Sequence, residues 1–128
     1  MSLLIMVMKM KTVSILGTEY KILVKKYDED EEFERRSICG YCNSYTKTIV
    51  VCDISTCKEW EHETQETCKI AQNETLRHEI IHAFLGESGL QDSCFAYDGS
   101  WAKCEEMIDW FAIQTPKLLQ TFKEADCL

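Results

Sequence analysis

The chain has 128 residues with a formal net charge of −8 and 45% hydrophobic residues. This length fits a single domain over residues 1–128 with its own hydrophobic core. The excess of acidic residues argues against nucleic-acid binding through a broad basic surface. Residues 1–9 are too short to span a membrane and lack the basic leader and cleavage site of a signal peptide. We therefore expect a cytoplasmic protein with no nucleic-acid or membrane partner, in which residues 1–9 are an extension and the native start is Met8 or Met10.

The first half of the chain predicts strands. Residues 11–26 carry two β-prone runs on either side of Gly17, which favours a β-hairpin. Residues 38–42 and 48–53 predict two further strands joined by a polar turn. The acidic run at 28–36 between these pairs predicts a mobile loop. Because the predicted helices all follow the strands, we expect an α+β fold with a small antiparallel sheet.

The segment His78-Glu79-Ile80-Ile81-His82 is the most informative motif in the chain. Histidines four residues apart lie one turn apart on a single helix face, where both can bind one Zn²⁺ ion. The intervening glutamate is the residue that zinc peptidases use as a general base. Asn73 as N-cap and Gly86 as C-terminal stop predict the ends of this helix. The preceding polar stretch either bends into it or continues it as one long helix.

A second helix is predicted over residues 101–113, where apolar side chains recur at helical spacing. Pro116 then opens a last short helix. A catalytic zinc site usually has three protein ligands and a water, so the two histidines need a third ligand from a neighbouring element. The helix over 101–113 offers Glu105, Glu106 and Asp109.

A His-Glu-x-x-His motif followed by a helix with Glu-x-x-x-Asp resembles the gluzincin metallopeptidases. The resemblance implies that Glu105 is the third zinc ligand beside His78 and His82. It also implies that Asp109, one turn later, orients a zinc-binding histidine through its other ring nitrogen. Glu106 is the alternative third ligand, and one position along the helix rotates it by about 100°.

The resemblance covers roughly residues 40–125 and implies a zincin-like fold in which an edge strand flanks the substrate cleft. We expect residues 48–52 to be that strand. Residues 75–90 and 105–110 further resemble small phage-encoded or bacterial zincin-like proteins of uncertain role. Cys104 stands where gluzincins often have Asn, and no motif places the His or Tyr that stabilises the oxyanion in larger members. The available candidates for that role are His62, Tyr41, Tyr45 and Tyr97.

Eight cysteines are a high count for a chain of this length. In a protein without a signal peptide they are expected to stay reduced. Cys39 and Cys42 have the spacing of a zinc knuckle or a redox pair, and Cys52 and Cys57 form a second pair. Together these four residues are an alternative, structural zinc site.

The sequence thus predicts a small zinc-dependent metallopeptidase with one Zn²⁺ ion per chain and a peptide or protein substrate. Glu79 would act as the general base on a metal-activated water. The alternative is a non-catalytic zinc-binding phage or host-interaction module with a structural or vestigial site. In that case a fourth protein ligand, such as Cys94 or Cys104, would replace the water.

Overall fold

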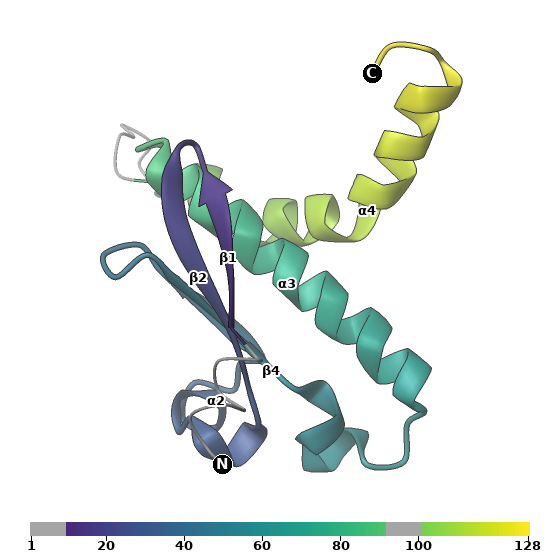
Figure 1. Cartoon of the computed structure of the whole chain (residues 1–128). Coiled ribbons are helices and arrows are strands. Elements are labelled where there is room, and N and C mark those ends of the chain that lie inside the picture. The colour runs from purple at the N-terminus through teal and green to yellow at the C-terminus, as the bar shows by residue number, and fades with distance from the viewer. Residues whose placement is uncertain (1–9, 92–100) are drawn as a thin grey trace.

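A four-stranded mixed sheet and a long helix form the body of the computed structural model, which describes residues 10–91 and 101–128 (Figure 1). The sheet order is β1-β2-β4-β3, and only the β2–β4 pair is parallel. The α+β prediction is confirmed. The expectation of an antiparallel sheet is wrong in one pair, because the chain passes from β2 to the far edge, forms β3 there, and returns as β4 parallel to β2. The strands are β1 Met10–Ile15, β2 Thr18–Lys25, β3 Gly40–Asn43 and β4 Thr48–Cys52.

The interior position of β4 in the sheet explains why its residues 49–52 are all apolar and buried. Ile49 and Val51 face a core cluster beneath the long helix, whereas Val50 and Cys52 belong to a second cluster. Successive side chains of a strand point to opposite faces, so a strand covered on both faces has no polar positions. The prediction that residues 48–52 form the edge strand is therefore wrong, and the edge beside the long helix is β3.

Helix α3, Gln65–Glu87, crosses one face of the sheet (Figure 1). Its N-cap is Thr64, whose side chain accepts a hydrogen bond from the Thr67 amide. The predicted N-cap Asn73 instead lies inside this helix, so the long-helix alternative is correct. The predicted stop at Gly86 is also wrong, because the helix runs to Glu87 and the left-handed glycine is Gly89, with φ 81°.

The acidic segment at 28–36 is folded rather than an open loop. It contains part of a 3₁₀ turn and the short helix α2, Glu32–Arg35, whose Phe33 is buried. Asp30 accepts hydrogen bonds from the Tyr41 hydroxyl at 2.5 Å and from Lys25 Nζ at 3.3 Å. Burial alone would raise the pKa of Asp30, but these bonds and one from a backbone amide outweigh it and lower the pKa. Since Tyr41 belongs to β3, this carboxylate joins α2 to the edge strand.

Helix α4, Glu105–Glu124, contains Pro116 in its interior and bends midway (Figure 1). The prediction that Pro116 opens a separate short helix is therefore wrong. A proline has no amide hydrogen to donate to the carbonyl four residues earlier, which here belongs to Ala112. That carbonyl accepts a hydrogen bond from Arg77 Nε of α3 at 2.5 Å instead. The proline thus leaves a carbonyl available that joins the two helices.

The remaining elements are single 3₁₀ turns, and no helix in the described part of the chain is long and apolar enough to cross a membrane. The 3₁₀ turns are η1 Tyr27–Glu29, η2 Ile54–Thr56, η3 Lys58–Trp60 and η4 Trp101–Lys103.

Glu87, the last residue of α3, joins this helix to the sheet through its carboxylate. Glu87 accepts hydrogen bonds from Lys47 Nζ at 2.9 Å, the Tyr20 hydroxyl at 2.7 Å and the Thr18 hydroxyl at 2.9 Å. These three partners, Lys47 first, lower the pKa of Glu87 to about 2. A depressed carboxyl pKa stabilises the fold above its unfolded value of about 4.3, and this contribution disappears as the pH falls towards the folded value.

We expect Glu87→Gln to lower the melting temperature at pH 7 and to flatten its dependence on pH between about 4.3 and 2. Melting curves recorded across this range test the expectation. Glu63→Gln, at an exposed position before α3, is the matched control and should reproduce the wild-type profile. An unchanged acid limb in Glu87→Gln would contradict the assigned role.

Candidate metal centre

The two motif histidines meet on one face of α3. His78 Nε2 and His82 Nε2 are 3.1 Å apart, and both side chains are largely buried. Glu79 lies within the same group, since His78, Glu79 and His82 each offer a ligand atom within 4.8 Å of the others. The His-Glu-x-x-His segment is therefore a potential metal-binding group on a helix that follows a small sheet.

Helix α4 brings Glu105 to the same point. Its Oε2 lies 2.9 Å from His78 Nε2, and its Oε1 lies 3.1 Å from His82 Nε2. Around a tetrahedral zinc ion with bonds of about 2.0–2.1 Å, neighbouring ligand atoms are about 3.3 Å apart. The two nitrogens and the carboxylate thus form a triangle only slightly smaller than one face of such a site.

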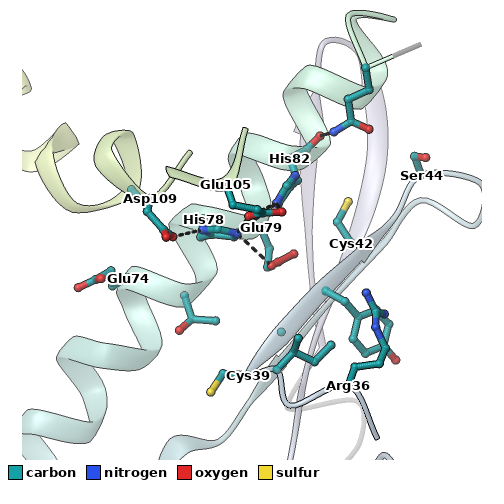
Figure 2. Close-up of a pocket in the computed structure, with 16 residues that line it drawn as sticks. Arg36, Cys39, Cys42, Ser44, Glu74, His78, Glu79, His82, Glu105 and Asp109 are labelled. Atoms are coloured by element: carbon teal, nitrogen blue, oxygen red, sulfur yellow. Dashed lines mark hydrogen bonds and ion pairs between the residues drawn. The ribbon is translucent and has the colours of Figure 1, made fainter. Parts of the chain in front are cut away.

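Asp109 lies behind this triangle, one turn after Glu105. Its Oδ1 is 2.6 Å from His78 Nδ1 (Figure 2). A carboxylate on Nδ1 keeps the proton there, so the lone pair of Nε2 points at the other donors. Glu106, the alternative ligand, is exposed and is not among the residues that line the groove at this site.

Glu79 is only 6% exposed although it is acidic. Its Oε1 lies 3.8 Å from His78 Nε2, beside the donor triangle but outside it. Burial raises the pKa of Glu79 to about 7, with the charge of His78 opposing the shift and that of Glu105 adding to it. A carboxyl with such a pKa can both accept and release a proton near neutral pH. Burial also lowers the pKa of His82, which favours the neutral imidazole that metals bind.

Gly40 allows β3 to approach α3 closely at Glu79. A Cβ on Gly40 would lie 3.0 Å from the Val50 carbonyl oxygen, 3.1 Å from Thr75 Cγ2 and 3.3 Å from Glu79 Cγ. The sequence interpretation did not assign this residue a role. The signal was present, because a glycine inside a strand often marks a close backbone approach.

The donor triangle faces a groove of about 570 Å³ between α3, α4 and β3. Figure 2 shows the histidines and Glu105 between the two helices, with Cys42 and Arg36 on the side of β3. The groove also contains Glu74 and Gln91, and the latter donates to the His82 carbonyl at 3.3 Å. Sequence reasoning did not place Arg36 and Cys42 beside the motif, because the end of α2 and β3 are far from it along the chain.

The four cysteines of the alternative zinc site are not brought together. Cys42 packs in the cluster that faces α3, whereas Cys52 and Cys57 belong to the other cluster. The thiols of Cys52 and Cys57 lie 3.3 Å apart and share a hydrogen bond. Within residues 10–91 and 101–128, His78, Glu79 and His82 form the only group of three or more His, Cys, Asp or Glu side chains that could bind a metal ion together. Cys104 is the exposed N-cap of α4, and Cys94 lies outside the described residues.

Of the described oxyanion candidates, Tyr41 lines the groove but uses its hydroxyl elsewhere, and Tyr45 and His62 are not among the lining residues. The hydroxyl of Tyr41 donates to Asp30. Tyr45 is 97% exposed, and the side chain of His62 is 94% exposed. Tyr97 lies outside the described residues.

Comparisons with known proteins add nothing to this geometry. A scan against protein-family models, a search of the curated proteins and a search of the solved structures each return no match. The arrangement of its own residues is therefore what marks this group as a candidate site.

The geometry predicts that the protein binds about one divalent transition-metal ion per chain. Simultaneous His78→Ala and His82→Ala changes should abolish binding, measured by metal analysis after gel filtration. His62→Ala is the control and should retain the metal. Asp109→Ala should weaken affinity by about 10–100-fold in a chelator competition, because His78 loses its orienting partner. A full metal content in the double variant would move the site elsewhere in the chain.

Gly40→Ala tests the close approach of β3 to α3. The added methyl group meets a backbone carbonyl and two helix side chains, so we expect the free energy of unfolding to fall by about 1–3 kcal/mol. Gly86→Ala is the comparison, because its nearest neighbour is the end of the flexible Gln91 side chain at 3.3 Å. Denaturant unfolding should show a smaller loss for that variant, or a gain from improved helix propensity.

Proposed function

We propose that the protein is a small zinc-dependent metallopeptidase. The observation that supports this proposal best is the convergence of His78 Nε2, His82 Nε2 and the Glu105 carboxylate next to the buried Glu79. Two imidazoles and one carboxylate are a donor set that catalytic zinc sites use, and three protein donors leave the fourth position for water or substrate. Zinc bound there would polarise the peptide carbonyl and lower the pKa of a coordinated water to about 7.

Glu79 is the residue that would move the proton. One of its carboxylate oxygens accepts a proton from the attacking water, and the same group then donates that proton to the leaving amine nitrogen. Its position supports this role, because it adjoins the donor triangle without belonging to it. The side chain lies against Gly40 of β3 and is largely shielded from bulk water.

The edge strand β3 is the place for an extended peptide. The carbonyl of Cys39 accepts a hydrogen bond from the Cys52 amide at 2.8 Å, so alternate residues of this strand bond to β4. In an antiparallel pair the intervening residues, Gly40 and Cys42, turn their backbone groups to the open edge. A substrate added as a further strand would bond to these groups and pass the donor triangle.

Glu79→Gln separates catalysis from metal binding. The amide keeps the size of the side chain but cannot accept the proton. We expect zinc content to stay nearly unchanged while peptide hydrolysis falls by a factor on the order of 10²–10⁴. Glu66→Gln, at an exposed position in the first turn of the same helix, should retain full activity.

The measurement is cleavage of a broad peptide library by zinc-loaded protein, followed by mass spectrometry. If the zinc-loaded wild type cleaves no peptide, the peptidase proposal fails. The non-catalytic zinc-binding module then becomes the better interpretation.

A further inference from the structure

One basic side chain lies in the groove and takes no direct part in the proposed proton transfer, although its charge opposes the rise in the pKa of Glu79. Among the 16 described residues that line the groove, Arg36 is the only lysine or arginine. The acidic side chains in the lining are Glu74, Glu79, Glu105 and Asp109. The chain as a whole has a net charge of −8, and among the described lining residues the guanidinium of Arg36 faces a groove that otherwise carries carboxyl groups.

The backbone around Arg36 is held firmly. Arg36 caps the C-terminus of α2, where Phe33 is buried in the core. The hydrogen bond from Tyr41 to Asp30 joins this segment to β3. The guanidinium carbon lies 5.8 Å from the centre of the Tyr41 ring, a distance at which a cation is attracted to the aromatic face. The side chain is therefore placed beside the edge strand by its surroundings.

The hydrogen-bonding capacity of Arg36 is nevertheless largely unused. Its nearest carboxylate is that of Glu32, 3.9 Å away, which is too long for a hydrogen bond. Within the described ranges the guanidinium donates no hydrogen bond to another side chain or to the backbone, and the side chain is 48% exposed. A guanidinium has five N–H donors in a planar fork that matches a carboxylate. This fork is available to a ligand in the groove.

The location of Arg36 matches the path of a peptide on β3. Side chains of an added strand would alternate between the face towards α3, where Cys42 lies, and the opposite face, where Tyr41 lies. Arg36 packs beside Tyr41 on this second face. A smaller hollow there shares Arg36, Tyr41, Cys42 and Ser44 with the main groove, so the two form a continuous surface around the strand edge.

We propose that Arg36 binds a carboxylate of the substrate, so that the protein prefers peptides with an acidic group close to the scissile bond. This inference rests on the proposed peptidase function and adds its substrate class. The charges along the groove support it, since Glu74 and Asp109 lie on the side of α3 and α4, away from Arg36 (Figure 2). A carboxylate is repelled on that side and attracted at Arg36, which also sets the direction of the bound peptide.

The test compares peptide pairs that differ only by Asp against Asn, or Glu against Gln, at each position around the cleaved bond. The wild type should prefer the acidic member by about tenfold or more in kcat/KM, as expected for a charge-assisted hydrogen bond. Arg36→Gln should remove this preference, Arg36→Lys should restore part of it, and Arg36→Glu should favour peptides with Lys instead. Lys69→Gln, an exposed charge on α3, is the control and should keep the wild-type ratio. Zinc content and circular dichroism check that each variant is folded and loaded.

Two sources of the carboxylate are distinguished by the ends of the peptides. If amidation of the peptide C-terminus removes the preference, Arg36 binds a terminal carboxylate. If the preference persists and follows the Asp or Glu position, it binds an acidic side chain. Equal cleavage of acidic and neutral peptides by the wild type and by Arg36→Gln would overturn the role of Arg36 and leave the peptidase proposal intact.

A binding measurement separates this failure from that of the proposed function. Fluorescence anisotropy of labelled Asp and Asn peptides on zinc-loaded Glu79→Gln protein needs no turnover. Tighter binding of the acidic peptide, lost when Arg36→Gln is added, supports the carboxylate site even if the wild type hydrolyses nothing. Equal binding of the two peptides, unaffected by Arg36→Gln, would overturn it.

Discussion

The crossing of α4 over α3 is the contact on which the candidate site depends. Ile108 and Ala112 are buried at this crossing, and Arg77 of α3 donates to the Ala112 carbonyl that Pro116 leaves free. Glu105 and Asp109 lie on the preceding turns of α4, so the same contact brings both carboxylates to the histidines. A shift of one position along either helix would separate the donors, because each residue turns the helix face by about 100°.

The site gathers more negative charge than the fold alone would favour. Glu79 is buried, and Glu105 lies close enough to add to the rise in its pKa. Burying an acidic group is costly unless it is neutralised or paired. A divalent cation at the donor triangle would offset this charge, and such coupling makes metal binding contribute to the stability of the fold.

The edge strand β3 connects the two proposed roles of the groove. Gly40 lets α3 approach closely enough to bury Glu79 against the strand. One residue later, Tyr41 faces the other way and joins α2, and with it Arg36, to the sheet. Successive residues of β3 face opposite sides of the sheet. Glu79, the proposed proton carrier, therefore lies on one side of the open edge, and Arg36, the proposed carboxylate-binding residue, lies on the other.

The sequence by itself determined the local features of this protein. A spacing of four residues on a helix places His78 beside His82, and Glu105 beside Asp109, independently of how the helices pack. The two hairpins and the α+β class followed equally from local patterns. The meeting of the two residue pairs at one point was an expectation from family resemblance, and it needed the helix crossing to be observed.

Only the tertiary structure decided which strand is at the edge, because strand order depends on pairing between segments far apart in the chain. It also decided the helix boundaries. Asn73 and Pro116 favour helix ends locally, but packing of α3 on the sheet and the Arg77 hydrogen bond to Ala112 outweigh those preferences. Gly40 and Arg36 acquire roles for the same reason. A glycine in a strand signals a close approach, but only the fold shows that α3 is the element that approaches Gly40 and that the groove opens beside Arg36.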